Sequence, residues 1–266
     1  MSATNTIGRS ILVMSGKGGV GKSTVTSQLA LSLALQGQKV GLLDVDICGP
    51  SLARMLGVED GEILQTDKGW QPVQIKKDLN LWLMSMAFLT NNKDSAVIWR
   101  GPKKHSMIER FIKGVDWGQI DCLVIDTPPG TSDEHISLVE ILKARGLKIS
   151  VLLVTTPQIV ACNDVRREIS FCKRIDIEIL GLVENMSGYV CPYCSECTKI
   201  FSSEGGTSLC QIANLKFLGS IPIDPALCKC TESGKSFVEE FRTSDAAKVL
   251  YQIADLCKEI NIEAIA

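Results

Sequence analysis

The chain has 266 residues, of which 45% are hydrophobic, and its formal net charge is −2 at pH 7. This composition predicts a globular protein with a sizeable core and argues against a surface for nucleic acid or anionic membrane. No apolar run reaches the roughly 20 residues of a membrane span, and residues 1–9 carry no targeting pattern. We therefore expect a cytoplasmic protein, in which the eleven cysteines favour metal or cluster binding over disulfides.

A glycine-rich segment lies between the first predicted strand, 10–15, and a helical pattern at 23–35. It fits G-x-x-x-x-G-K-[ST], in which backbone N–H groups and the positive end of the next helix face phosphate oxygens. Lys22 is expected to reach the β- and γ-phosphates, and Ser23 to ligate Mg2+. The expected ATP-binding residues are Gly16, Lys17, Gly18, Gly19, Val20, Gly21, Lys22, Ser23 and Thr24.

Lys17 is a charge that an ordinary phosphate loop does not require at this position. A long cation there projects outward and can reach a phosphate held by a second subunit, as an arginine finger acts in trans. We therefore expect a dimer and a catalytic role for Lys17. A solvated lysine is the alternative interpretation.

Strands and helices alternate along the rest of the chain. The predicted strands are 39–43, 79–84, 121–126, 149–154, 177–184 and 215–219, and the predicted helices are 103–113, 132–143, 157–173 and 244–258. This order predicts an α/β fold, a mainly parallel sheet with helices on both faces and ligands beyond the carboxyl ends of the strands. We expect a single domain spanning 1–266, with a cysteine-bearing loop at about 188–200.

Carboxylates follow two of the predicted strands. Asp126 ends an apolar strand and is expected to hold the water shell of Mg2+. Asp46 follows the strand at 39–43, where a carboxylate can orient the attacking water, and Asp44 beside it is the alternative.

The segment CPYCSEC places three thiols, Cys191, Cys194 and Cys197, within seven residues. A [4Fe-4S] cluster takes four cysteines, so two C-x-x-C pairs related by a twofold axis would complete it. We expect Cys191 and Cys194 to be the ligands of each chain and Cys197 to play at most a supporting role. A zinc site that adds Cys228 and Cys230 is the alternative, although its spacing suits a zinc ribbon poorly.

Several segments together resemble one family. The string GKGGVGKST resembles the deviant Walker A class of P-loop NTPases, and LLDVDICGPS, WRGP, LVIDTPPGTSDEH, NMSGYVCPYC and IPID make the chain similar to the Mrp-type ATP-dependent iron–sulfur carriers over about residues 8 to 260. The resemblance implies slow ATP hydrolysis that serves the assembly of labile [4Fe-4S] clusters and their transfer to cytosolic and nuclear apoproteins.

The resemblance also implies site residues and partners. An asparagine at the position of Asn185 reads the adenine edge in the class, and Pro222 and Asp224 resemble the second wall of the base pocket. The first cysteine is Cys48, so the chain is similar to the short form of the family, which lacks an N-terminal four-cysteine motif. We thus expect a homodimer and a heterotetramer with the long form, alongside apo iron–sulfur proteins and downstream assembly factors as partners.

Two other functions remain open from the sequence. A spatial-positioning ATPase of the septum-site or partition type would need a basic amphipathic C-terminal helix or a basic face for DNA. A reductase similar to the nitrogenase iron protein would use the cluster for electron transfer.

Overall fold

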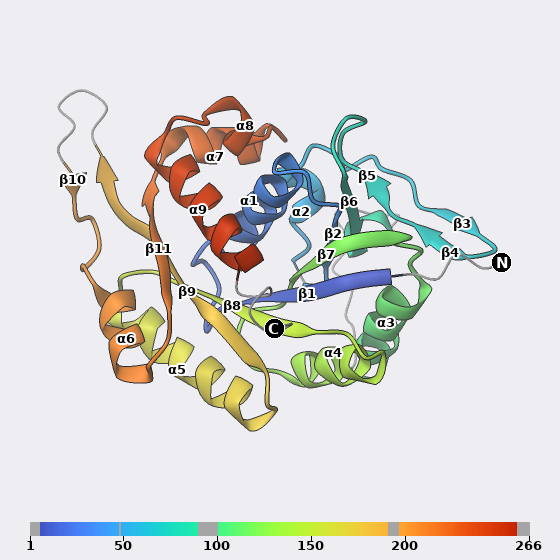
Figure 1. Ribbon diagram of the computed structural model, residues 1–266, viewed down its shortest axis with the longest axis horizontal. Helices are drawn as coiled ribbons and strands as arrows, with labels where there is room; N and C mark the ends of the chain where they lie inside the picture. Colours follow the sequence, from blue (N-terminus) through green and yellow to red (C-terminus); the bar gives the residue numbers. More distant parts are fainter. Residues whose placement is uncertain (1–5, 48, 90–100, 191–196, 260–266) are drawn as a thin grey trace.

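The computed structural model of this chain describes residues 6–47, 49–89, 101–190 and 197–259 (Figure 1). One sheet has the strand order β10-β9-β8-β1-β7-β2-β6-β5, and β11 also pairs with β9. Its strands are β1 (Thr6–Met14), β2 (Val40–Asp44), β5 (Val73–Gln74), β6 (Leu81–Ser85), β7 (Gln119–Asp126), β8 (Ile149–Thr155), β9 (Glu178–Val190), β10 (Cys197–Thr198) and β11 (Phe217–Ile223). Only β5 and β10 pair antiparallel within the described sheet, so the expected α/β fold with a mainly parallel sheet is confirmed.

Helices cover both faces of this sheet (Figure 1). One layer holds α1 (Lys22–Leu35), α2 (Leu52–Met55), α7 (Pro225–Glu232), α8 (Phe237–Glu240) and α9 (Asp245–Glu259). The opposite layer holds α3 (Gly101–Gly114), α4 (Asp133–Ala144), α5 (Ile159–Arg174) and α6 (Gly205–Ala213), and a short 3-10 helix, η1 (Met86–Phe88), follows β6.

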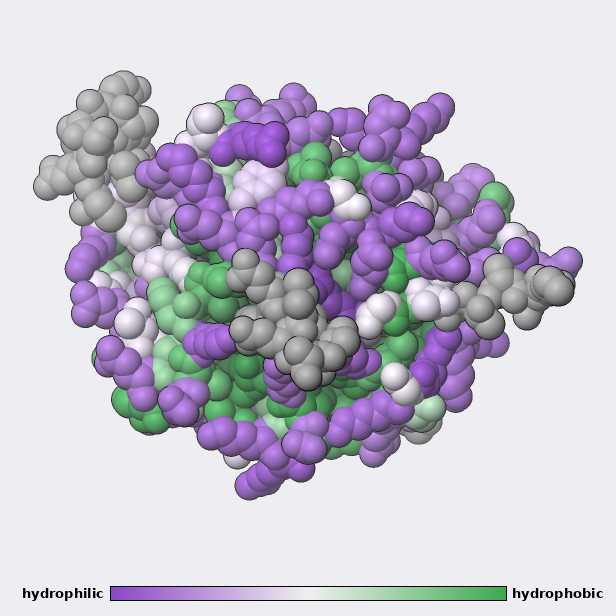
Figure 2. All heavy atoms as spheres, in the orientation of Figure 1, coloured by the Kyte–Doolittle hydropathy of each residue, from purple (hydrophilic) through white to green (hydrophobic). Residues whose placement is uncertain are grey.

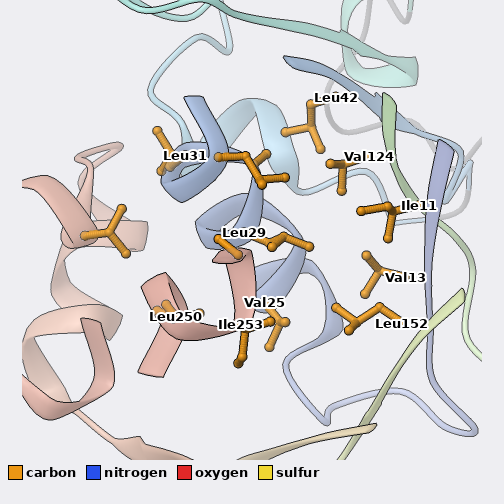
Figure 3. Packing of buried hydrophobic residues seen from close by; sticks show 14 of the residues in the cluster. Ile11, Val13, Val25, Leu29, Leu31, Leu42, Val124, Leu152, Leu250 and Ile253 are labelled. Carbon is orange, nitrogen blue, oxygen red and sulfur yellow. The ribbon is translucent and has the colours of Figure 1, made fainter. Parts of the chain in front are cut away.

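The sheet separates two hydrophobic clusters, because successive side chains of a strand point to opposite faces. In β1, Ile11 and Val13 pack in the cluster with α1 and α9, while Leu12 and Met14 pack in the other. Figure 3 shows the first cluster, in which Leu29 of α1 lies between the sheet and α9. Parallel strands buried on both faces read as continuous apolar runs, which is why the sequence located them well.

Some elements differ from the expectation. Between the predicted strands 39–43 and 79–84, the structure adds a two-stranded hairpin, β3 (Leu64–Thr66) and β4 (Gly69–Gln71). Helices α6 and α7 lie in parts of the chain for which the sequence predicted neither a helix nor a strand. The strand expected at 177–184 continues as β9 to Val190, so the first part of the expected loop at 188–200 is strand.

The molecular surface shows hydrophilic side chains over most of the face in Figure 2, and hydrophobic ones gather in the lower left and lower centre of the view. In α6, Ile212 is 72% exposed. Within the part of the chain that the structure describes, no helix is both long and apolar enough to cross a membrane.

A buried carboxyl group in α5 gives the fold a pH dependence. Glu168 is 1% exposed, and its Oε2 has no hydrogen-bond partner among the described residues. Burial, with a contribution from Asp164, raises the pKa of Glu168 to about 7. A carboxyl group whose pKa is higher in the folded chain destabilises the fold increasingly as pH rises from its unfolded pKa to its folded pKa.

Glu168→Gln is therefore expected to stabilise the protein at pH 8 by about 1 kcal/mol or more, since one pKa unit corresponds to about 1.4 kcal/mol. The gain should shrink toward pH 5, where the folded wild-type carboxyl group is itself protonated. Urea unfolding at both pH values measures this, with the exposed Glu140→Gln on α4 as control. An equal effect at pH 5 and pH 8 would contradict the assignment.

Candidate functional site

The phosphate loop connects β1 to α1, as expected from the sequence. Gly19 and Gly21 both have φ of +80°, a left-handed conformation that glycine adopts without strain. Gly21 is the N-cap of α1, where no side chain caps the helix and the first turn contains no acidic residue. The N-terminal end of α1 is therefore suited to receive an anion.

A cavity of about 210 Å3 opens over this loop. A side-chain carbon added to Gly18 or Gly19 would meet nothing within 4 Å, so this part of the loop faces open space. On the other side, a carbon added to Gly16 would lie 2.5 Å from the Asp164 backbone, which shows how closely the loop packs on α5. The lining residues are Ser15, Lys17, Gly18, Gly19, Gly21, Lys22, Ser23, Thr24, Asp46, Ser51, Met55 and Pro129.

Asp126, at the end of β7, accepts three side-chain hydrogen bonds from α1. Its Oδ1 accepts from Lys22 Nζ at 2.5 Å and from Thr26 Oγ1 at 2.8 Å, and its Oδ2 accepts from Ser23 Oγ at 2.6 Å. The carboxylate is fully buried and Lys22 is 6% exposed. The structure thus brings together the three residues expected to handle phosphate and Mg2+, although they lie about 100 positions apart in the sequence.

The two carboxylates after β2 occupy different environments. Asp46 is half-buried and lines the cavity, whereas Asp44 is fully buried behind it. Asp44 accepts hydrogen bonds from Ser85 Oγ at 3.1 Å and from Leu52 N at 3.4 Å. Burial, with Asp126 nearby, raises the pKa of Asp44 to about 8. Of the two candidates, Asp46 therefore has the access to the cavity that orienting a water would require.

Lys17 lies at the rim of the cavity. Its Nζ is 3.5 Å from Oε1 of Gln158, the residue before α5, and its carbonyl accepts a hydrogen bond from Ser15 Oγ. The side chain is half-buried, and its role across a dimer stays a prediction.

The residues expected at the base pocket lie on neighbouring strands. Asn185 of β9 pairs with Ile221 of β11, next to Pro222. The Asn185 side chain is 5% exposed and donates from Nδ2 to the Val20 carbonyl of the phosphate loop at 2.9 Å. Asp224 caps α7, accepting from Ala226 N at 2.8 Å. These three residues do not line the cavity over the phosphate loop, and their contact with adenine stays a prediction.

The two cysteines expected to bind the cluster, Cys191 and Cys194, lie outside the described residues. The chain on either side of them forms an antiparallel hairpin, in which Val190 of β9 pairs with Cys197 of β10, and Tyr189 with Thr198. In Figure 1 this hairpin rises at the upper left, beyond the end of β8. The hairpin therefore extends from the carboxyl edge of the sheet, where the phosphate loop also lies.

Two residues of this region had no role in the sequence-based prediction. Thr26 bonds to Asp126, and its position one turn after Ser23 on the same helix was the available signal. Glu184 is 1% exposed and accepts hydrogen bonds from Ser187 Oγ and Gly206 N. An acidic residue in an otherwise apolar strand pattern was its only signal.

Cys228 and Cys230, the alternative zinc ligands, both lie in α7. Cys228 is exposed, whereas Cys230 is buried with its Sγ 3.9 Å from Glu240 Oε2. Among the described residues no group of three or more potential ligands is placed to hold a metal ion.

Comparison with known proteins gives consistent matches. A family model described as NUBPL iron-transfer P-loop NTPase matches residues 6–258. A relative from Dictyostelium discoideum, named cytosolic Fe-S cluster assembly factor NUBP2 homolog, is 56% identical over 245 residues, covering 92% of each chain. The Homo sapiens protein named cytosolic Fe-S cluster assembly factor NUBP2 is 52% identical over 244 residues, covering 92% of this chain and 90% of its own.

Solved structures also match. The nucleotide-binding protein from Archaeoglobus fulgidus in complex with ADP has a TM-score of 0.75 and 37% identity, covering 86% of this chain and 88% of its own. The septum site-determining protein MinD from Pyrococcus horikoshii, complexed with Mg-ADP, has a TM-score of 0.70 at 24% identity, covering 95% of this chain and 97% of its own. At that identity, the second match shows a shared fold only.

Proposed function

This chain belongs to the family of NUBPL iron-transfer P-loop NTPases, and we propose that it binds ATP, assembles [4Fe-4S] clusters and passes them to cytosolic and nuclear apoproteins. Its relatives are named cytosolic Fe-S cluster assembly factors, which agrees with the expected cytosolic location. The observation that carries the proposal is that the phosphate loop and the hairpin flanking Cys191 and Cys194 share one edge of the sheet.

The residues that line the cavity over the phosphate loop fit Mg-ATP. Ser23 and Asp126 offer the oxygen atoms that Mg2+ prefers, and they face each other at 2.6 Å. Mg2+ would neutralise charge on the phosphates. Lys22 would bind the β- and γ-phosphates, and Asp46, which also lines the cavity, would orient the attacking water.

A second copy of the chain is the partner that completes the cluster site. Three aliphatic side chains near Lys17 and the hairpin support such an interface, because Ile159 is 70%, Val160 65% and Ile200 53% exposed. Ile159 and Val160 follow Gln158, the contact of Lys17, and Ser202 near Ile200 donates to the Pro157 carbonyl. Exposed apolar groups gathered in this way mark an interaction surface. We extend the proposal to a heterotetramer with a long-form paralogue, which co-purification and native mass would test.

Anaerobic reconstitution with iron and sulfide tests the function. We expect the absorbance of a [4Fe-4S] cluster, about one cluster for each pair of chains from the four-cysteine requirement, and transfer of that cluster to an apoprotein. Stable retention of the cluster during electron transfer would favour a reductase instead. Failure to bind iron and sulfide would contradict the carrier function.

The described structure does not favour α9 as the membrane-binding helix of a positioning ATPase. The apolar side of α9 is buried, including Leu250, Ile253 and Cys257, and it packs against α1 and β11. That side is therefore not available for a membrane surface, as an interfacial amphipathic helix requires.

Lys17→Ala is expected to cut ATP hydrolysis by about tenfold or more while changing ATP affinity by less than about threefold. A cation that acts on the transition state across a dimer contributes to kcat rather than to ground-state binding. Steady-state phosphate release and nucleotide titration measure the two quantities, with Lys39→Ala at the opposite edge of the sheet as control. Unchanged hydrolysis would exclude the trans role.

A further inference from the structure

Strand β9 changes its conformation between the phosphate loop and the cysteine hairpin. Ile221 of β11 pairs with Asn185, and Ile223 pairs with Tyr189. An advance of two residues along β11 therefore corresponds to an advance of four along β9. Within this bulge Met186 has φ of +57° and Gly188 has φ of +83°. A non-glycine residue with positive φ is uncommon and costs conformational energy. We call residues 184–188 the β9 joint.

The β9 joint contacts the phosphate loop directly. Asn185 donates to the Val20 carbonyl at 2.9 Å, and a side-chain carbon on Gly21 would lie 2.2 Å from Asn185 Nδ2. The same carbon would lie 3.5 Å from Met186 Cε. The loop and the joint are thus packed without space between them. A shift of the loop backbone toward the joint must therefore displace Asn185 or Met186.

Glu184 holds the joint to the chain that follows the hairpin. Its Oε1 accepts from Ser187 Oγ at 2.6 Å, on the strand leading to Cys191. Its Oε2 accepts from Gly206 N at 2.7 Å, at the start of α6 beyond β10. Hydrogen bonds to a buried carboxylate are among the strong ones in proteins. One side chain therefore ties the strand that leads into the hairpin to the helix that follows the hairpin.

We propose that the β9 joint couples ATP to the cluster: Glu184 is a positioning residue that transmits occupancy of the phosphate loop, through Asn185, to the chain that flanks the cysteine pair. This inference rests on the proposed function, since it assigns the route between its two sites. When phosphate binds, the loop N–H groups turn toward it, the Val20 carbonyl moves with them, and Asn185 follows. The joint then changes the separation or orientation of the hairpin legs.

The test measures iron release to a chelator from the reconstituted protein, without nucleotide and with Mg-ATP. We expect the wild-type rate to differ between the two states by about fivefold or more, the lower end of typical coupling between sites. In Glu184→Gln the ratio of the iron-release rates with and without Mg-ATP should fall below about twofold. ATP affinity and iron content should stay close to wild type. Ser187→Ala, which removes one of the two contacts and keeps the charge, should give a partial loss.

A matched control lies on the same strand. Glu178 accepts from Ser150 Oγ at 3.1 Å at the far end of β9, so Glu178→Gln removes an equivalent charge without touching the joint. It should keep the full nucleotide response. A full response in both Glu184→Gln and Ser187→Ala would overturn the inference.

A second readout needs no cluster and separates this inference from the proposed function. Hydrogen exchange of the backbone at 186–190 should change in wild type when Mg-ATP is added, and the change should be lost in Glu184→Gln. If exchange responds but no cluster forms, the joint moves as inferred and the carrier function is wrong. If a cluster forms but wild-type exchange does not respond, the inference is wrong and the carrier function stands.

Discussion

Replacing Lys22 with alanine is expected to weaken Mg-ATP binding by about 10- to 150-fold, because a hydrogen bond to a charged group contributes about 1.5 to 3 kcal/mol. Lys22 is the buried cation of the phosphate cavity, and Ala leaves both Asp126 and the phosphates without it. Isothermal titration with Mg-ATP measures the loss.

Folding needs its own control in this case, because removing one partner of a buried pair leaves an uncompensated charge. Lys22→Arg keeps a cation near Asp126, yet its larger guanidinium does not fit the glycine loop, so it too should bind ATP weakly while folding normally. Wild-type affinity in either variant would show that the loop does not hold phosphate through Lys22.

The second large effect concerns the cysteine segment. Cys191→Ala and Cys194→Ala should each reduce reconstituted iron and sulfide to near background, because a twofold axis removes two of four ligands at once. Cys197→Ala should keep most of the iron. Its backbone belongs to β10, where it pairs with Val190.

ATP binding serves as the folding control for these variants, and the exposed Cys228→Ala on α7 serves as the matched cysteine control. All should bind ATP as wild type does, since the hairpin lies beyond the layers that form the core. Wild-type iron in Cys194→Ala, or stoichiometric zinc in the native protein without a reconstitutable cluster, would overturn the cluster assignment.

The sequence predicted those parts of the site that are local in the chain. The phosphate loop is nine consecutive residues, and its chemistry follows from their spacing alone. The buried parallel strands were likewise visible as apolar runs, and most of their ends agree with the structure to within three residues.

Contacts between distant segments were not predictable in the same way. The bonds from Lys22 and Thr26 to Asp126 depend on the register between β1 and β7, in which Val13 lies opposite Asp126. Choosing between Asp44 and Asp46 required knowing which carboxylate the cavity reaches. The bulge in β9 had one weak signal, Gly188, because a glycine inside a strand pattern suggests a bulge, whereas the residue type of Met186 does not predict its positive φ.

The β9–β10 hairpin lies beyond the end of β8, apart from the ATP-binding residues. The segment that it carries can therefore vary in sequence while the ATP-binding residues stay constant. Exposed segments outside a core accept insertions and exchanges with little cost. A chain with this fold can therefore carry a longer segment between β9 and β10, or metal ligands of another kind there, with its ATP-binding residues unchanged. One condition limits these changes: Ser187 before the new segment and Gly206 after it must still reach the carboxyl group of Glu184.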